Sequence, residues 1–168
     1  MQKQPVQEHQ KDNNDPAHYV TISGRWRVER HTPDGYGKMV LAEVREGINV
    51  ITTVGKAALA TYLASAAATA MTNTFKYMAI GTGIAAESAA DTALGTEVSR
   101  HTGTVTYVSA AIYQVVATFA TGSGTGAITE YGLFNSNAVG TMFCRDVESS
   151  ISKGASDTLT TTLQITLS

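Results

Sequence analysis

The last twelve residues of the chain, 157–168, alternate between apolar and polar side chains. One face carries Leu159, Thr161, Leu163, Ile165 and Leu167, and the other carries Thr158, Thr160, Thr162, Gln164 and Thr166. A period of two places successive side chains on opposite sides of a strand. The sequence therefore predicts a half-buried strand of an antiparallel sheet, with one face rich in threonine.

Similar strand-like runs fill most of the chain after residue 75, with turns rich in glycine, serine and asparagine between them. The runs are Phe75–Ile80, two runs within Thr102–Gly122 that meet near Ser109, Ala127–Asn135 and Gly140–Ser149. Short strands at this spacing are typical of all-β sandwiches and barrels. We therefore predict a mainly β fold, an antiparallel β-sandwich or jelly-roll-like domain of six or more strands.

One segment, Asn49–Ala68, has the pattern of a helix. Small and apolar residues recur there at i, i+3, i+4 and i+7, which predicts one buried helical face. They are Gly55, Ala58, Leu59, Tyr62, Leu63 and Ala66. Thr52 or Thr53 can cap the first turn. The alanine content and Lys56 favour a helix packed on a sheet over a membrane span.

The first 50 residues differ from the rest, since they hold 14 of the 26 charged residues and all three prolines. Residues 1 to about 17 are polar, and we expect an extended arm there. Two strand-like runs follow, His18–Arg30 and Gly37–Gly47, with a turn signal at Pro33, Asp34 and Gly35 between them. We predict an N-terminal arm and β-ribbon over residues 1–47 and a β-rich assembly domain over residues 48–168.

Side chains of the ribbon and of the last strand are candidates for contacts between subunits. A two-stranded ribbon is marginally stable alone, so it must pack on the domain or on another chain. Arginines around Trp26 lie close to glutamates, which favours a solvated or inter-subunit face over a nucleic-acid patch. The threonine face suits either a copy of the chain or solvent. The candidate contact residues are Tyr19, Trp26, Arg27, Thr158, Thr160 and Thr162.

Composition and spacing favour a protein that is not an enzyme. The net charge of −2 and pI near 6.0 indicate no field that would attract nucleic acid or an anionic membrane. Cys144, the single cysteine, lies in an apolar run and is predicted to be buried. The histidines have no metal-ligand spacing, and a metal site assembled from distant residues is left open. No hydrolase or Walker motif is present, and we predict no catalytic, cofactor-binding or metal-binding residues.

The stretch Phe75–Ala86 resembles a dinucleotide-binding turn, because a strand meets Gly81-Thr82-Gly83. That fingerprint needs a helix after the turn and a further βαβ unit. A short helix at Ala85–Ala90 is one option, but the chain then returns to antiparallel strand patterns. We therefore interpret the glycines as the exit of a core strand rather than as a phosphate cradle.

A series of motifs in order carries a resemblance to a known group of proteins. The series is NVITTVGKAALATYLA, FKYMAIGTG, DTALGTEVSR, ATFATG, GAITEYGLFNSNAVGTMFCRDV and KGASDTLTTTLQITLS. This order resembles tailed-bacteriophage virion proteins, namely the N-terminal attachment domain of tail-collar fibre proteins and small standalone head or tail surface proteins. The resemblance spans about residues 48–168.

The resemblance implies a β-rich domain that forms a homo-oligomer, often a trimer, and docks on a virion assembled in the bacterial host cytoplasm. It implies the major capsid protein or tail and adaptor proteins as partners, while charge and motifs predict no nucleic acid, membrane or cofactor. The chain departs from the fibre pattern, because no shaft follows Ser168 and about 47 residues precede the domain. We expect a capsid decoration protein or a tail-fibre adaptor. The alternative is a glycan-binding module that uses Tyr36, Tyr107 and Tyr131.

Overall fold

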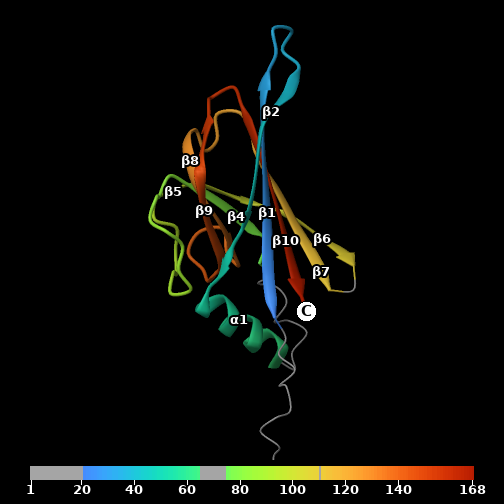
Figure 1. The fold of residues 1–168 in the computed structure, drawn as a ribbon, viewed down its shortest axis with the longest axis vertical. Helices are drawn as coiled ribbons and strands as arrows, with labels where there is room; N and C mark the ends of the chain where they lie inside the picture. The colour runs from blue at the N-terminus through green and yellow to red at the C-terminus, as the bar shows by residue number, and fades with distance from the viewer. Residues whose placement is uncertain (1–20, 65–74, 110) are drawn as a thin grey trace, which may run out of the picture.

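The computed structural model describes residues 21–64, 75–109 and 111–168. The described residues form two antiparallel sheets of five strands each and a single helix, which confirms the predicted mainly β, sandwich-like fold (Figure 1). Sheet A has the order β2 (Met39–Ile48), β1 (Ile22–Pro33), β10 (Thr158–Leu167), β7 (Ile112–Phe119) and β6 (Thr104–Ser109). Sheet B has the order β3 (Val50–Ile51), β9 (Met142–Lys153), β8 (Gly126–Phe134), β4 (Tyr77–Gly81) and β5 (Glu97–Thr102).

The core lies between the sheets and follows the period-two pattern of the strands. On β10, Leu159, Leu163 and Ile165 are fully buried, as the alternation predicts. Leu167, at the end of the strand, is exposed, so its predicted burial is wrong. Large side chains of this core include Trp26, Met78, Phe119, Ile128, Tyr131, Leu133 and Phe143. Burial of this apolar surface is the main term that holds the two sheets together.

The β1–β2 ribbon is part of the sandwich. β1 pairs antiparallel with β10 over ten residues, from Ile22 opposite Leu167 to His31 opposite Thr158. β1 therefore lies inside sheet A, and Trp26 and Val28 contribute to the core. Only the far end of the hairpin projects beyond the other strands (Figure 1). Its turn lies where it was predicted, with the Asp34 carboxylate accepting hydrogen bonds from the backbone N–H groups of Tyr36 and Lys38.

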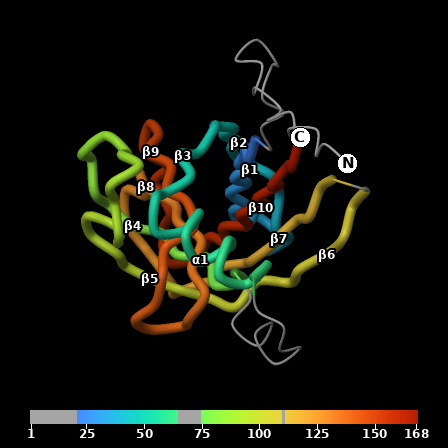
Figure 2. Tube along the Cα trace, turned by 90° about the horizontal axis from the view of Figure 1, so that it is seen from below, coloured from blue at the N-terminus to red at the C-terminus, as the bar shows by residue number. Residues whose placement is uncertain are grey.

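The helix α1 (Thr53–Ala64) crosses one end of the gap between the sheets (Figure 2). The Thr52 hydroxyl accepts a hydrogen bond of 3.0 Å from the Gly55 N–H, so Thr52 is the cap. Gly55 is buried against β9, where a Cβ atom would lie 2.5 Å from the Phe143 carbonyl oxygen. Ala58, Leu59 and Tyr62 pack on the core, as predicted.

The predicted helical face is too wide on one side. Leu63 is 81% exposed because α1 packs on the end of the sandwich only through a narrow stripe of residues, mainly against β9. Ala66 lies outside the described residues.

Candidate interaction face

The outer face of sheet A is a broad surface on which neither helix nor loop of the described residues packs. Residues opposite each other in the register share a face of the sheet. Rows of such residues run across all five strands, for example Ile48, Arg25, Gln164, Gln114 and Thr106. The next row holds Glu46, Arg27, Thr162, Val116 and Thr104. We call this surface, with Glu29, Thr118, Thr158, Thr160 and Thr166, the outer face of sheet A.

The structure brings together four of the six predicted contact residues on this face. Thr158, Thr160 and Thr162 stand in alternate positions along β10, and Arg27 lies opposite Thr162. Trp26 has the opposite orientation, and its ring is buried in the core against Tyr131, with 5.7 Å between the ring centroids. Trp26 is therefore unavailable for a contact between subunits in this fold. Tyr19 lies outside the described residues.

Most polar groups of the face are engaged with neighbours across the strands. The Arg27 guanidinium binds Glu29 at 2.7 Å and Glu46 at 2.6 Å. Thr118 and Thr160 share a hydrogen bond of 3.0 Å, and Gln164 donates to Gln114 at 3.0 Å. These contacts tie the side chains of neighbouring strands together, and Arg27 is shared by two carboxylates. Such a face suits contact with another folded surface, since few charges have to be stripped of water.

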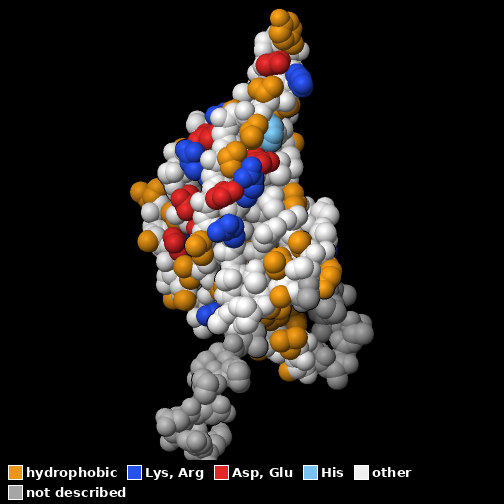
Figure 3. All heavy atoms as spheres, turned by 45° about the vertical axis from the view of Figure 1, so that its right-hand side comes forward, with side chains coloured by type: hydrophobic (Ala, Val, Ile, Leu, Met, Phe, Trp, Pro, Cys, Tyr) orange, Lys and Arg blue, Asp and Glu red, His pale blue; other side chains and the backbone are white. Residues whose placement is uncertain are grey.

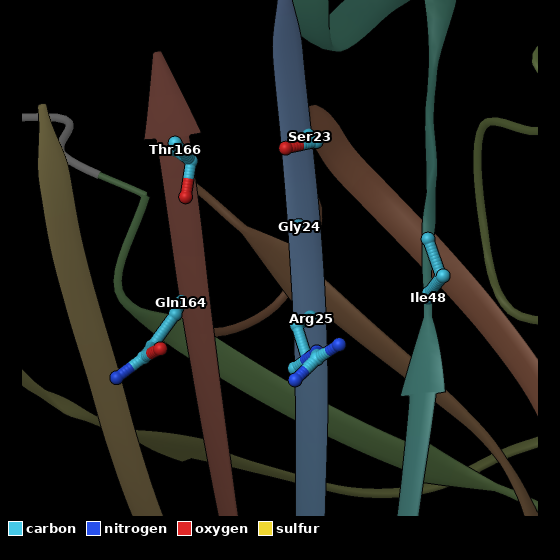
Figure 4. A pocket seen from close by; sticks show the side chains of 6 residues that line it. All are labelled: Ser23, Gly24, Arg25, Ile48, Gln164 and Thr166. Carbon is cyan, nitrogen blue, oxygen red and sulfur yellow. The ribbon is translucent and has the colours of Figure 1, made fainter. Parts of the chain in front are cut away.

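Two adjoining hollows interrupt the flat face. The larger has a volume of about 330 Å³ and is lined by Ser23, Gly24, Arg25, Ile48, Gln164 and Thr166 (Figure 4). It lies beside Gly24, which has no side chain, and where β2 ends at Ile48. The smaller hollow, of about 210 Å³, shares Arg25 and Gln164 with it. Arg25 forms no ion pair among the described residues, so its guanidinium is free to bind an incoming acceptor group.

The projecting hairpin tip carries apolar side chains in water. Tyr36 is 98% exposed, and Met39, Val40 and Leu41 are exposed beside it. Hydrophobic side chains are visible at this tip in Figure 3. Sequence reasoning missed this cluster because an alternating strand predicts one buried face, and the ribbon extends past the strands that would bury it. The run Met39, Val40, Leu41 next to a turn with Tyr36 was the available signal.

The glycine loop, residues 82–96, is fastened to sheet B by a buried ion network. Glu130 on β8 is fully buried and accepts hydrogen bonds from the N–H groups of Gly83, Gly95 and Thr96 at 2.7–2.9 Å. Arg145 on β9 binds the same carboxylate at 2.8 Å. It also binds Asp91 of the loop at 2.8 Å and donates to the carbonyl oxygen of Ala85.

This network explains the role of Gly83 and Gly95, whose N–H groups bind Glu130. Burial alone would raise the pKa of Glu130, but hydrogen bonds from Thr96, Gly95, Arg145 and Gly83 outweigh it and lower the pKa below its ordinary value. The amide donors that a bound phosphate would need therefore already bind an internal carboxylate. The loop contains turns and no helix, so the helix considered at Ala85–Ala90 is absent.

A second set of buried polar groups lies between the two sheets, with Trp26 on β1 and Tyr131 and Asp146 on β8 and β9. Trp26 Nε1, Tyr131 Oη and Asp146 Oδ2 are buried and have no hydrogen-bond partner among the described residues. Burial, with the nearby charges of Glu148 and Glu87, raises the pKa of Asp146 to about 7. A Cβ atom on Gly47 would lie 2.6 Å from both Asp146 Oδ2 and Glu148 Oε1, so these two carboxylates are close together.

The remaining predicted groups are dispersed. Tyr36 and Tyr107 are exposed at separate places, whereas Tyr131 is fully buried, so its predicted exposure is wrong. Cys144 is buried as predicted, and burial raises the pKa of its thiol. No group of three or more metal-ligating side chains occurs in the described ranges. Within those ranges the chain forms no helix long and apolar enough to cross a membrane.

Comparison of the chain with protein-family models, with curated proteins and with solved structures gave no match.

Proposed function

We propose that the chain is a non-enzymatic structural protein of a tailed-phage virion, a homo-oligomeric β-module on the surface of the capsid or tail. The observation that carries the proposal is the projecting β1–β2 hairpin with Tyr36 and Leu41 exposed near its tip. Apolar side chains at the end of a ribbon stay in water unless a partner covers them. The hairpin therefore has the chemistry of a docking element for the major capsid protein or a tail or adaptor protein.

The outer face of sheet A supports the same proposal. Arg27 is paired with Glu29 and Glu46, and threonines and glutamines are hydrogen-bonded across the strands, so contact with a copy or a virion surface costs little desolvation outside the hollow at Arg25. The ordered motif series from NVITTVGKAALATYLA to KGASDTLTTTLQITLS resembles that of phage attachment domains. Hairpin, flat face and motif series together favour a module that docks over one that turns over a substrate.

Immunogold labelling of purified virions tests the location. We expect labelled heads for a decoration protein and labelled tails for a fibre adaptor. Particles without label on either part would overturn the proposal.

Variants of the hairpin test the mode of attachment. Replacing Leu41 with Asp places a charge among the exposed apolar side chains without touching the core. The matched control is Val139→Asp, since Val139 is an exposed apolar residue in the turn between β8 and β9. We expect the hairpin variant to lower the number of copies per particle about tenfold or more, as loss of an interface anchor does. Equal incorporation of both variants would contradict docking through the hairpin.

A glycan-binding module is the second candidate, and the larger hollow on sheet A favours it. Arg25, Gln164 and the hydroxyls of Ser23 and Thr166 surround a volume of about 330 Å³, which is enough for one sugar ring with acidic or hydroxyl groups. Glycan-array binding that is lost in Arg25→Ala and kept in Leu41→Asp would support this function. An array without any binding would remove it.

A further inference from the structure

The two sheets have four edge strands in the described part of the chain, namely β2, β6, β3 and β5. An edge strand presents unpaired backbone N–H and C=O groups that can pair with another chain. Proteins protect such edges by charges, irregular pairing or short length. β3 has only two residues. β2 carries Glu43, Arg45 and Glu46, and β5 carries Glu97 and Arg100 together with a register shift against β4.

β6 has none of these protections along most of its length. Its sequence, Thr104–Ser109, holds no charged residue and no proline, and every residue is exposed. Its pairing with β7 is regular from Thr104 to Tyr107, and a register shift occurs only beyond that point. Tyr107 is 74% exposed, with Val105 and Val108 exposed beside it. Figure 3, in which the right-hand side of Figure 1 with β6 and β7 is turned forward, shows hydrophobic side chains gathered on the lower part of this side.

We propose that β6 is the docking strand for a second copy of this chain, pairing antiparallel with β6 of that copy about a two-fold axis at Thr106. The inference rests on the proposed homo-oligomer and names its interface. The pairing extends sheet A of one copy into sheet A of the other. It satisfies the backbone groups that β6 leaves unpaired, because each edge supplies donors and acceptors to the other.

The side chains of β6 complement themselves in this register. Thr106 faces Thr106 across the axis, and Val105 of each copy faces Tyr107 of the other. Threonine pairs and pairs of an aromatic with a β-branched residue are among the favourable cross-strand pairs. A two-fold interface uses the same patch on both copies, so a neutral patch meets a neutral patch and no like charges are opposed. A charged strand from another protein would find no counter-charge on β6, which favours a copy as the occupant.

Sedimentation of the full chain tests the interface with charged variants at the axis. Thr106→Lys and Thr106→Glu each place two like charges opposite each other. We expect each to raise the dissociation constant of the dimer about tenfold or more. An equimolar mixture of the two restores the dimer, which excludes misfolding as the cause. The control Val98→Lys, on edge strand β5, leaves dimerisation unchanged.

A disulfide tests the register. Thr106→Cys under mild oxidation gives a covalently linked dimer, since residues opposite each other in an antiparallel pair have Cβ atoms about 4.5–5.5 Å apart. The native Cys144 is buried and does not compete. Val98→Cys is the control and stays unlinked.

The possible failures are distinguishable. A wild-type oligomer that persists in both charged variants overturns the role of β6 and leaves the virion proposal standing. A wild-type chain that stays monomeric at high concentration overturns both the β6 pairing and the homo-oligomer. Virion labelling then decides separately whether the chain is a particle protein.

Discussion

Two polar pairs lie one residue apart on β8 and β9 and face opposite sides of sheet B. Glu130 and Arg145 are on the outer side, beneath the glycine loop. Tyr131 and Asp146 are on the inner side, in the gap between the sheets, and are opposite each other in the register. The outer carboxylate has five hydrogen bonds, from Gly83, Gly95, Thr96 and twice from Arg145. The inner pair leaves Tyr131 Oη and Asp146 Oδ2 without a partner among the described residues.

The comparison shows that burial alone does not decide whether a polar group stabilises a fold. Glu130 is fully buried, yet its pKa is lowered because backbone donors and an arginine surround the charge. Asp146 is buried with acidic neighbours, and its pKa is raised to about 7. The outer pair fixes a loop, whereas the inner pair costs stability whenever Asp146 is charged.

The largest effect is expected from removing the outer carboxylate. Glu130→Ala leaves Arg145 buried without its main partner and three loop N–H groups without an acceptor. Breaking a buried pair of this kind costs about 3–5 kcal/mol of unfolding free energy. Urea unfolding at neutral pH measures it, with Glu97→Ala, which removes an acid paired with Arg100 at the surface, as the control. A loss below about 1 kcal/mol would show that the network does not hold the loop.

Neutralising Asp146 in the inner pair is expected to raise the unfolding free energy, whereas removing Glu130 lowers it. The pKa of Asp146 in the folded state, about 7, lies above its ordinary value of 3.8, so the folded state binds the proton more tightly. Its contribution to stability is therefore fully present below about pH 4 and is lost as the pH rises through 7. Asp146→Asn removes the charge and should raise the unfolding free energy at pH 8 by about 2–4 kcal/mol.

Unfolding free energies of wild type and Asp146→Asn between pH 4 and 8 check this. The two values converge near pH 4 and diverge as the pH rises to about 7. A constant difference across the range would mean that Asp146 does not titrate there, and a less stable variant at pH 8 would contradict the expected sign.

The sequence predicts the strands better than it predicts these pairs. Alternation along residues 158–166, the turn after Pro33 and the Thr52 cap are local signals, and each is confirmed. The pairing of β1 with β10 joins residues far apart in the chain, so no local pattern shows that Trp26 belongs to the core. No spacing in the sequence indicates that Glu130 and Asp91 share a partner, because only the fold brings Arg145 between them.

Substitution of Gly83 in the glycine loop is expected to disturb the outer pair and to cost less stability than removal of Glu130. A Cβ atom on Gly83 would lie 2.5 Å from Glu130 Oε1 and 2.8 Å from Glu130 Cδ, so Gly83→Ala forces the carboxylate away from its donors. Overpacking of this kind costs about 1–3 kcal/mol. Gly35→Ala is the matched control, because nothing lies within 4 Å of its Cβ position. Thermal unfolding compares the two, and equal melting temperatures would mean that the loop shifts without loss.

The smallest loss of unfolding free energy is expected from Asp91, the second carboxylate that binds Arg145 of the outer pair. Asp91 binds Arg145 at 2.8 Å but is partly exposed, so solvent screens the interaction and Arg145 keeps Glu130 when Asp91 is neutralised. Asp91→Asn should therefore lower the unfolding free energy by about 0.5–1 kcal/mol. Burial alone would raise the pKa of Asp91, but hydrogen bonds from Arg145 and Ser88 lower it below its ordinary value. The contribution of Asp91 to the unfolding free energy is therefore lost as the pH falls through that lowered pKa.

Urea unfolding of Asp91→Asn alone and in combination with Glu130→Ala separates the role of Asp91 from that of Glu130. With the pair already broken, Asp91 becomes the remaining partner of Arg145, and the same substitution costs more than in the wild type. An equal cost in both backgrounds would show that Asp91 and Glu130 act on the loop independently.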